Sequence, residues 1–205
     1  MTPNISAIIL AAGKSIRMGQ PKMLLPWGDT TVLGQVTMTF NKIGIADIIV
    51  VTGGDREVVE AEASRLAEVL SVRSVYNPSF EQMGMMSSIQ VGLASLPADC
   101  KAVLIGLGDQ PQVEEKTLKE ILEIYVTTGA GIIVPSYENR RGHPVLLGGV
   151  HRLELLNFNP QSSLRDFMKA HQEEIYYVKA GASVLQDLDT PQDYQNYQGN
   201  LSTRE

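Results

Sequence analysis

Residues 10–22, LAAGKSIRMGQPK, combine small side chains with several cations in one short segment. The cations are Lys14, Arg17 and Lys22, and the Ala-Ala-Gly that precedes them lets the backbone approach a ligand closely. Cationic side chains and backbone amides that face one point together bind anions, phosphate groups in particular. The segment therefore predicts a site for a phosphorylated ligand, and the alternative is a solvated basic loop beside a tight turn.

The letters Gly13-Lys14-Ser15 match the end of a P-loop, but the spacing around them does not. In the P-loop pattern G-x-x-x-x-G-K-[ST] the first glycine would fall at Ile8, inside an apolar run. A β-branched residue cannot take the backbone angles that a glycine supplies there. The dinucleotide fingerprint G-x-G-x-x-G is absent from this segment as well. The phosphate chemistry of the loop is therefore of another kind.

Acidic side chains later in the chain could form a metal site. Asp109 directly follows an apolar run at residues 102–107, and Asp187 and Asp189 stand at alternate positions of a later extended segment. Mg²⁺ is usually bound by one or two carboxylates together with substrate phosphates. Asp109 with one of the later acids is thus a candidate metal pair. The alternatives are that Asp109 stabilises a turn and that Asp189 caps the helix that follows it.

Two further positions could contact a substrate. His143 precedes Pro144, which restricts its backbone to extended conformations and suits a rigid contact, although it could equally be a turn residue. Ser88 follows a loop that enters a helix and could contact a base or ribose, whereas Ser87 could simply be the N-cap. The chain's three histidines show no spacing typical of zinc sites, and no G-x-S-x-G motif is present. Neither a zinc site nor covalent nucleophilic catalysis is indicated.

Strand-like and helix-like patterns alternate along the first two thirds of the chain. We predict strands at residues 5–10, 47–51, 72–76, 102–107 and 131–135, and helices at 31–43, 55–70, 86–96 and 114–127. Such alternation predicts an α/β fold with a mostly parallel sheet and helices on both faces. In such sheets ligands bind beyond the carboxyl ends of the strands. The loops at 11–22, 52–55, 77–85 and 108–113 are therefore expected to meet at one edge.

The length of 205 residues suits a single domain. We predict that this domain spans residues 1–198 and that residues 199–205 form a flexible tail. The alternation weakens after residue 136, so residues 136–178 are expected to form an excursion that covers the site on its acceptor side.

Composition narrows the classes of partner and compartment. The 23 acidic and 17 basic residues give a net charge of −6, which argues against general binding to nucleic acid or membrane surfaces. The single cysteine, Cys100, excludes an internal disulfide and fits a reducing compartment. The N-terminal residues lack a signal-peptide pattern, and no apolar run has the length of a membrane span. We expect a soluble, cytoplasmic protein.

The ordered set of motifs resembles the MobA-like nucleotidyltransferase family, and most closely its molybdenum cofactor cytidylyltransferase branch. The first motif is Leu10-Ala11-Ala12-Gly13-x-Ser15-x-Arg17-Met18-Gly19-x-x-Lys22. The later ones are Asn77-Pro78, Gly84-Met85-x-x-Ser88, Gly108-Asp109-Gln110-Pro111, Gly142-His143-Pro144 and Asp187-Leu188-Asp189-Thr190-Pro191-x-Asp193-Tyr194. They occur in the family's order and span almost the whole chain. The resemblance implies a Rossmann-like three-layer sandwich of the nucleotide-diphospho-sugar transferase type.

The resemblance also implies transfer of a nucleoside monophosphate from an NTP to a phosphate on a small acceptor, with release of pyrophosphate and with Mg²⁺, or Mn²⁺, as the cofactor. It gives catalytic roles to Arg17, Lys22 and Asp109 and metal binding to Asp109 and Asp189. The implied nucleotide-binding residues are Leu10, Ala11, Ala12, Gly13, Arg17, Lys22, Thr52, Gly53, Ser88 and Gly108. The implied acceptor-binding residues are Gln110, Gly142, His143 and Pro144.

The resemblance favours particular substrates. Ala12 stands where the guanylyl branch usually has glycine, and the extra side chain beside the base favours CTP over GTP. The implied acceptor is molybdopterin, and a transient contact with a molybdoenzyme or its chaperone is implied with it. In the segment at residues 159–165 the family often has Gly-Asp-x-Gly-Ala-Arg, of which Arg165 alone remains. A cytidylyltransferase for an isoprenoid precursor or a sugar phosphate therefore stays open, as does a non-catalytic module that binds a nucleotide or delivers a cofactor.

Overall fold

The computed structural model describes the backbone of residues 4–201 and the side chains of residues 4–197. Its centre is an eight-stranded sheet with the strand order β10-β7-β9-β6-β1-β4-β5, to which β8 is added by pairing with β7. The strands are β1 (Ile5–Ala11), β4 (Asp47–Thr52), β5 (Val72–Tyr76), β6 (Ala102–Leu107), β7 (Ile132–Tyr137), β8 (Arg140–Arg141), β9 (Val145–Gly148) and β10 (Ile175–Lys179). β2 (Pro26–Trp27) and β3 (Thr30–Thr31) form a separate hairpin.

The helices that pack on this sheet are α1 (Val32–Lys42), α2 (Arg56–Leu66), α3 (Phe80–Ala94), α4 (Glu115–Thr128), α5 (Gly149–Leu156) and α6 (Leu164–Ala170). The C-terminal helix α7 (Pro191–Leu201) packs beside Trp27 of β2 instead. Short 3-10 turns are η1 (Lys22–Leu24), η2 (Gln172–Glu174) and η3 (Ala182–Leu185). Within the described part of the chain, no helix has both the length and the apolar composition that crossing a membrane requires.

Most strands of the main sheet point in one direction. β1 pairs in parallel with β4 and β6, β4 with β5, and β7 with β10. β9 runs antiparallel between β6 and β7, so β7 has the same direction as β6. The carboxyl ends of β1, β4, β5, β6, β7 and β10 therefore lie along one edge, as the alternating pattern predicts.

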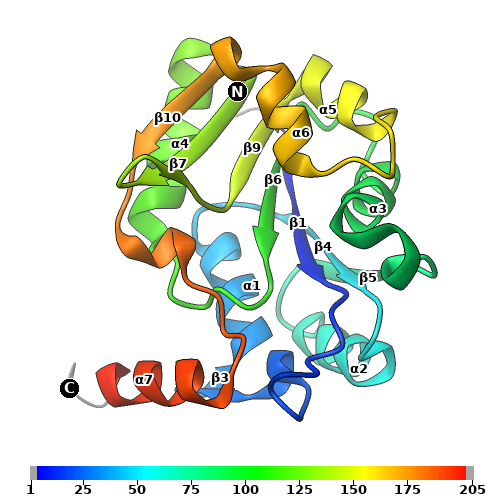
Figure 1. Cartoon of the computed structure of the whole chain (residues 1–205), viewed down its shortest axis with the longest axis vertical. Helices are drawn as coiled ribbons and strands as arrows, with labels where there is room; N and C mark the ends of the chain where they lie inside the picture. Colours follow the sequence, from blue (N-terminus) through cyan, green and yellow to red (C-terminus); the bar gives the residue numbers. More distant parts are fainter. Residues whose placement is uncertain (1–3, 202–205) are drawn as a thin grey trace.

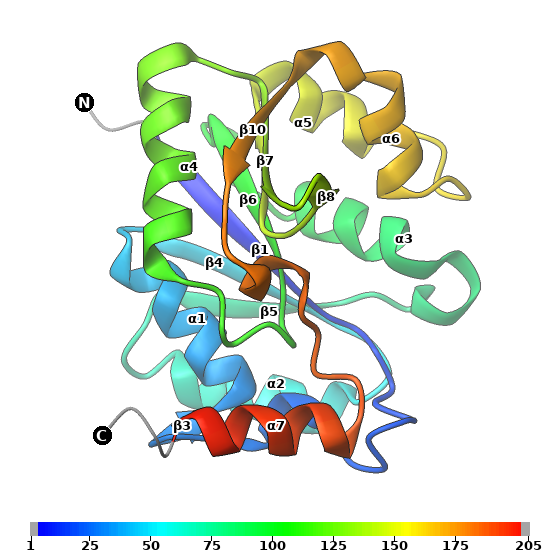
Figure 2. The same ribbon diagram turned by 60° about the vertical axis from the view of Figure 1, so that its left-hand side comes forward.

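Helices cover both faces of the sheet, which makes a three-layer sandwich (Figures 1 and 2). The period of two in β1 shows how the sequence directs this. Ala7 and Ile9 belong to a buried cluster with side chains of α1, α2 and α4. Ile8 and Leu10 point the other way, into a cluster with side chains of α3, α5 and α6. β1, which is apolar at every position from Ala7 to Ala11, is thus buried on both faces.

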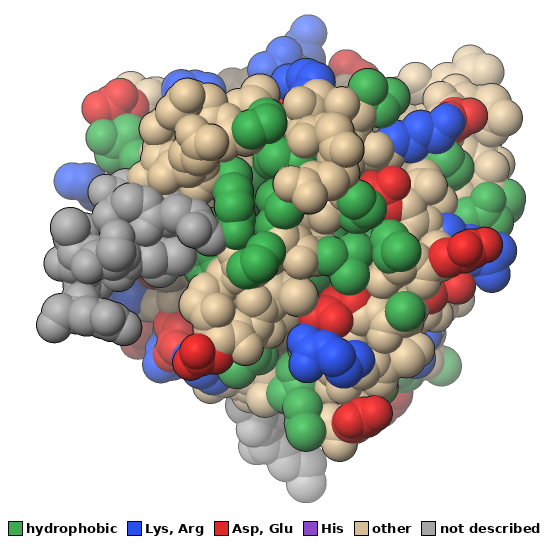
Figure 3. Space-filling model, turned by 90° about the horizontal axis from the view of Figure 1, so that it is seen from below, with side chains coloured by type: hydrophobic (Ala, Val, Ile, Leu, Met, Phe, Trp, Pro, Cys, Tyr) green, Lys and Arg blue, Asp and Glu red, His purple; other side chains and the backbone are tan. Residues whose placement is uncertain are grey.

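A third, smaller cluster fastens the C-terminal helix to the segment after the first loop. It contains Met18, Leu25, Trp27, Val32 and Leu188, with Tyr194 and Tyr197 of α7 packed against it. Figure 3 shows the face at the lower end of Figure 1, where hydrophobic side chains gather across the middle and are interspersed with acidic and basic ones. This packing places the segment before α7 beside the carboxyl edge of the sheet.

The starts of three helices differ in their local chemistry. Thr31 caps α1, since its hydroxyl accepts a hydrogen bond from the Gly34 amide at 2.9 Å. Asp55 occupies the N-cap of α2 but its side chain makes no capping bond there. α3 begins at Phe80, earlier than the predicted residue 86, and is kinked at Gly84, whose φ of 61° is left-handed.

The structure departs from the prediction for residues 136–178. This segment supplies β9 and most of β10 to the main sheet, and the parts that project from the sheet are the β8 turn, α5 and α6. β9 has four residues and is antiparallel, so neither its length nor the αβ alternation indicates it. The tail predicted at 199–205 is also different, because α7 continues to Leu201; residues 202–205 lie outside the described part.

Candidate active site

The predicted loops meet at the carboxyl edge of the sheet and are joined by backbone hydrogen bonds. The Gly54 amide donates to the Ala12 carbonyl at 3.0 Å, which joins the loops after β1 and β4. The Gly108 amide donates to the Leu10 carbonyl at 2.9 Å, which joins the ends of β1 and β6. The expected convergence of the loops after β1, β4 and β6 is therefore present in the structure.

The segment that carries Asp189 joins the same edge from the far end of the chain. The Leu188 amide donates to the Asp109 carbonyl at 3.0 Å, so the residues before α7 run alongside the loop after β6. Asp187 and Asp189 then have different partners. Asp187 Oδ1 accepts a hydrogen bond from the side-chain nitrogen Nε2 of Gln110 at 2.7 Å, whereas the carboxylate of Asp189 accepts one from Arg17 of the cationic loop.

Lys22 stands between the two candidate metal acids. Its Nζ donates to Asp109 Oδ2 at 2.5 Å and to Asp189 Oδ1 at 3.0 Å. Arg17 adds a second cation, since its Nη2 donates to the other oxygen of Asp189 at 2.7 Å. The two acids are 80 residues apart in the sequence (109 and 189) and are brought to one ammonium group. The structure thus assembles Arg17, Lys22, Asp109 and Asp189 into one cluster.

Burial and the neighbouring charges shift the pKa values of Lys22 and Asp109. Lys22 is 9% exposed, and burial alone would lower its pKa, but the attraction of Asp109 and then Asp189 outweighs burial and raises it. Burial raises the pKa of Asp109, and the neighbouring Lys22 ammonium opposes that shift. Lys22 therefore remains a cation at neutral pH, held where anions must come together.

Ser15, to which the sequence assigned no role, fixes the conformation of the loop after β1. Its hydroxyl donates to Asp55 Oδ2 at 2.7 Å and accepts from the Lys22 amide at 3.1 Å. Ser15 has a φ of 50°, a left-handed conformation that is uncommon outside glycine. This contact explains why Asp55 does not cap α2 with its side chain. Ser15 could be found in the sequence only as a member of the motif.

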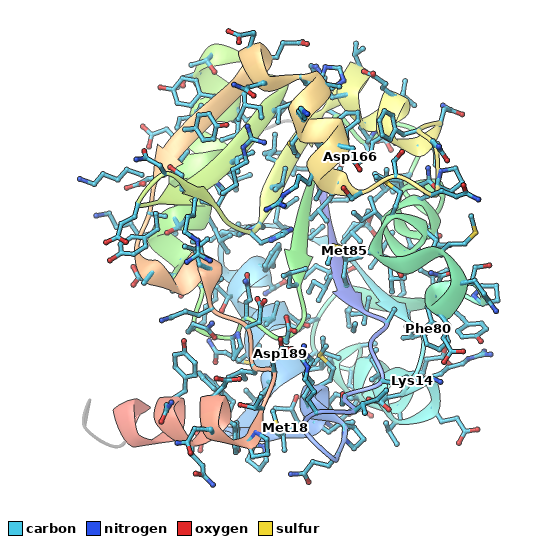
Figure 4. All side chains as sticks on the ribbon, viewed as in Figure 1. Lys14, Met18, Phe80, Met85, Asp166 and Asp189 are labelled. Carbon is cyan, nitrogen blue, oxygen red and sulfur yellow. The ribbon has the colours of Figure 1, made fainter. Side chains whose placement is uncertain are left out.

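Lys14 has a partner of its own on α3. It forms an ion pair with Glu81, and its Nζ lies 5.8 Å from the centre of the Phe80 ring. Figure 4 shows Lys14 and Phe80 on the same side of the molecule, away from Asp189. Lys14 therefore does not simply point to solvent, because an acid and an aromatic face attract its ammonium group. It still lies outside the cluster around Lys22.

Three of the positions expected beside the nucleotide are buried in the structure, namely Thr52, Gly53 and Ser88. Gly53 is buried, and a Cβ there would lie 2.5 Å from the Ala12 carbonyl oxygen and 2.8 Å from Phe80, so only glycine fits. The Thr52 hydroxyl donates to the carboxylate of Glu60, a residue of α2, at 3.1 Å. Ser88 is buried, and its hydroxyl accepts from Asn77 Nδ2 at 2.9 Å. Direct contact of Thr52 and Ser88 side chains with a nucleotide remains a prediction.

Asn77 organises the entrance to α3. Its side-chain amide donates to the hydroxyls of both Ser87 and Ser88 at 2.9 Å, and its carbonyl accepts from the Ser79 amide at 3.0 Å. Ser87 therefore lies inside α3 and is not its N-cap, since the helix begins at Phe80. The Asn77-Pro78 pair of the motif indicates this position in the sequence, but it does not predict the hydrogen bonds of the Asn77 side chain.

On the acceptor side, four predicted residues lie close to one another. Gln110 is buried and bonds to Asp187, while the His143 amide donates to the Val184 carbonyl at 3.0 Å. Gly142 and Pro144 flank the histidine and are buried, whereas the His143 residue as a whole is half-buried. The Nε2 atom of His143 is buried and has no hydrogen-bond partner among the described residues. Burial lowers the pKa of His143 to about 4, so the ring is neutral at pH 7.

A cavity of about 1260 Å³ opens beside His143, between α3, the β8 turn and α6. Three exposed arginines line it, Arg140, Arg141 and Arg165. Arg141 is steadied by Tyr177, whose hydroxyl accepts from its Nε at 2.8 Å. A cavity with several guanidinium groups and an unpartnered imidazole nitrogen suits an anionic, polar ligand.

The carboxylates of Asp109 and Asp189 fit a divalent cation of the Mg²⁺ type. They are hard oxygen donors, they approach one point, and a positive charge, that of Lys22, already lies between them. The Asp187 carboxylate, bonded to Gln110, is the weaker candidate of the two later acids.

Comparison with known proteins identifies the family. The model of the MobA-like NTP transferase domain matches residues 7–175. The chain belongs to this family. It is a nucleotidyltransferase with the Rossmann-like fold of that group, as the motifs predict.

Individual relatives of the family agree over almost the full length. Molybdenum cofactor cytidylyltransferase from Escherichia coli strain K12 is 28% identical over 191 residues, which cover 93% of this chain and 93% of that protein. The crystal structure of Rv0371c from Mycobacterium tuberculosis H37Rv matches with a TM-score of 0.80 at 28% identity, covering 96% of this chain and 97% of that one. A complex of Rv0371C with manganese matches with a TM-score of 0.71 at 27% identity, covering 96% and 98%.

Proposed function

We propose that this MobA-like nucleotidyltransferase transfers CMP from CTP to the phosphate of molybdopterin and releases pyrophosphate. The observation that carries the proposal is the cluster in which Lys22 bridges Asp109 and Asp189 beside the Ala-Ala-Gly loop. It provides what joining two phosphates requires: carboxylates for a cation, and fixed positive charge for the leaving group. The name of the Escherichia coli relative supports the choice of cytidine and of the molybdenum cofactor.

The reaction needs no covalent intermediate on the enzyme. A phosphate oxygen of the acceptor attacks the α-phosphorus of CTP, the new P–O bond forms, and the bond from that phosphorus to the bridging oxygen breaks. The electron pair of that bond leaves with pyrophosphate. The nucleophile is already an anion, so the chain's task is to hold two anions in line and to stabilise the charge that develops on pyrophosphate. Lys22 and Arg17, the two cations of the cluster, would perform that task.

Asp109 and Asp189 would hold the cation, Mg²⁺ or Mn²⁺. When bound, the ion neutralises charge on the triphosphate and on the leaving pyrophosphate. Lys22 and Arg17, which now pair with these carboxylates, are the groups that can turn toward phosphate oxygens instead. The assignment of Asp189 over Asp187 follows from this shared position, since Asp187 already bonds to Gln110.

Ala12 supports the choice of a pyrimidine. Its carbonyl accepts from Gly54, and its methyl group stands beside Gly53, at the junction of the loops after β1 and β4. A methyl group at this junction reduces the room for a purine. Ala12→Gly is expected to narrow the preference for CTP over GTP, because a methyl-sized change in a pocket shifts discrimination by about tenfold or more.

The acceptor would occupy the cavity lined by His143 and the arginines. The neutral imidazole of His143 can donate a hydrogen bond to a polar heterocycle or accept one from it. A phosphate group of the acceptor would be complemented by the guanidinium groups of Arg140, Arg141 and Arg165. Arg165 remains from the family's segment whose other residues differ here. A transient docking of the molybdoenzyme that receives the product, or of its chaperone, belongs to the same proposal.

The proposal is tested by measuring pyrophosphate release with each NTP, Mg²⁺ or Mn²⁺, and a panel of acceptors: molybdopterin, an isoprenoid precursor phosphate and sugar phosphates. We expect release that requires CTP, a divalent ion and molybdopterin together. If pyrophosphate is released only with a sugar phosphate or only with an isoprenoid precursor, that compound and not molybdopterin is the acceptor. Nucleotide binding without turnover for any acceptor would favour a binding module.

A further inference from the structure

A second cluster of metal-binding side chains lies at the opposite end of the sheet from the active site. It consists of His151 in α5, His171 at the C-cap of α6, and Glu174 in η2. The cluster lies at the amino ends of β7 and β10, because Glu174 directly precedes β10 and His151 contacts Gly131, which directly precedes β7. Figure 4 shows Asp189 at the other end of the view from α5, which carries His151. The three residues come from separate elements, which is why no spacing in the sequence indicated them.

The donor atoms of this cluster face one point. The Glu174 carboxylate lies between the rings, with Oε2 at 2.9 Å from His151 Nε2 and Oε1 at 2.9 Å from His171 Nδ1. One donor atom from each residue falls within 4.8 Å of the others. The histidines are largely buried, at 14% and 13% side-chain exposure, and Glu174 opens the cluster to solvent at 56%. An ion therefore has a path in and preformed donors to meet.

The other nitrogen of His171 makes a second contact. Its Nε2 lies 2.9 Å from Glu154 Oε1 on α5. Histidines that bind metals usually donate their free ring nitrogen to a carboxylate, which fixes the tautomer and the ring orientation. Glu154 provides this for His171 and leaves Nδ1 directed at Glu174.

Packing fixes both rings from behind. The His171 ring lies 4.6 Å from the Phe167 ring and 5.1 Å from the His151 ring, measured between centres. His151 lies against Gly131 at the start of β7, where a Cβ would overlap the imidazole. The absence of a side chain at Gly131 is thus what gives His151 its place. Two histidines held in this way lose little side-chain entropy when they bind an ion.

We propose that His151, His171 and Glu174 bind one transition-metal ion of the Zn²⁺ class, with Glu154 as a positioning residue. Two imidazole nitrogens and one carboxylate, with solvent at the fourth position, form a common zinc ligand set. Zinc holds nitrogen ligands at about 2.0–2.1 Å, so small side-chain rotations must close the cluster around the ion. Mg²⁺ prefers oxygen ligands and belongs at Asp109 and Asp189 instead.

The alternative is a charge network that takes no metal. A protonated His171 can donate from both nitrogens to Glu174 and Glu154, which satisfies the same contacts. The ion would replace the Nδ1 proton and join α5, α6 and η2 at one point. α6 also carries Arg165 at its other end, on the acceptor cavity, so the site would fasten the helix that lines that cavity.

Titration of the metal-stripped chain with Co²⁺ and Zn²⁺ in millimolar Mg²⁺ tests the proposal. The readouts are the visible absorption of bound Co²⁺, its displacement by Zn²⁺, and the bound metal per chain. We expect one site that persists in Asp109→Asn and is lost in the double variant His151→Ala, His171→Ala. Glu154→Gln should keep the site and weaken it about 10- to 100-fold.

Two matched controls separate this site from general loss of histidine or charge. His143→Gln removes the remaining histidine, and Glu173→Gln removes an exposed acid next to Glu174; neither should change the Co²⁺ spectrum or the affinity. Urea unfolding of the metal-free variants checks the fold, and Glu174→Gln, which keeps the side-chain size, serves if an alanine variant is unstable. The proposal is overturned if wild type binds no Co²⁺ at micromolar concentrations, or if the double variant binds it equally well.

Discussion

The two sides of the active site that we propose for the nucleotide and for the acceptor are built in different ways. On the nucleotide side, backbone hydrogen bonds fix the loops, as in the 3.0 Å bond from Gly54 to Ala12. On the acceptor side, the cavity is lined by exposed side chains, Arg140, Arg141 and Arg165. Exposed side chains can be exchanged without moving the backbone. We therefore expect the reaction shared by the family to depend on the side fixed by backbone bonds, and the choice of acceptor to depend on the side lined by exchangeable side chains.

The largest effect is expected on the fixed side, at Asp109. Asp109→Asn should lower kcat about 1000-fold, or about 4 kcal/mol, because a neutral amide cannot hold the cation that offsets pyrophosphate charge. Pyrophosphate release measures the rate, and urea unfolding checks that the fold is intact. A variant with near-normal rate and a lower unfolding midpoint would show that Asp109 is structural.

The next effect compares two lysines of the same loop. Lys22→Ala should lower kcat about 100-fold with a smaller change in the KM for CTP, because charge builds on pyrophosphate mainly in the transition state. Lys14→Ala, which breaks the ion pair with Glu81, should change kcat/KM by less than about tenfold. Steady-state kinetics of both variants give the comparison. Equal losses would mean that a diffuse positive field, and not a fixed phosphate contact, does the work.

The third effect belongs to the exchangeable side. Arg165→Ala should raise the KM for the acceptor by about tenfold and leave the KM for CTP unchanged, since one charge-assisted hydrogen bond is lost. Lys169→Ala is the matched control, because it removes an exposed cation of the same helix that does not line the cavity. A rise in the KM for CTP in the Arg165 variant would contradict the division between the two sides.

The smallest effect is a pH dependence of stability at His143. Burial, opposed in part by Asp109, lowers the pKa of His143 from 6.5 to about 4. The unfolded chain therefore takes up this proton at a higher pH than the folded chain, and stability is lost as the pH falls from 6.5 toward 4. When the pH is lowered from 7 to 6, the free energy of unfolding of the wild type should fall by roughly 0.5–1 kcal/mol more than that of His143→Gln. Urea unfolding at both pH values measures this, and parallel losses would show that His143 titrates as an exposed histidine.

The sequence predicts the loops after β1, β4 and β6 better than it predicts the cavity lined by the arginines, for a physical reason. Strands buried on both faces read as nearly continuous apolar runs, as at β1 (Ile5–Ala11), where Ser6 is the one polar residue. The ends of such runs locate Asp109 and the cationic loop. β9 has four residues and runs antiparallel, so it carries too little pattern to be distinguished from a loop. Contacts between distant side chains, such as Lys14 with Glu81, depend on the kinked start of α3, which local sequence did not indicate.

The position of β9 has a consequence for synthesis of the chain on the ribosome. β6 and β7 are made before β9, and each has an edge that β9 later pairs with. A nascent chain that has not yet released Val145–Gly148 therefore leaves both of these edges unpaired, and unpaired edges are templates for association with other chains. A strand of four residues covers both edges at once, so the rate at which it docks limits how long they are exposed to misassembly.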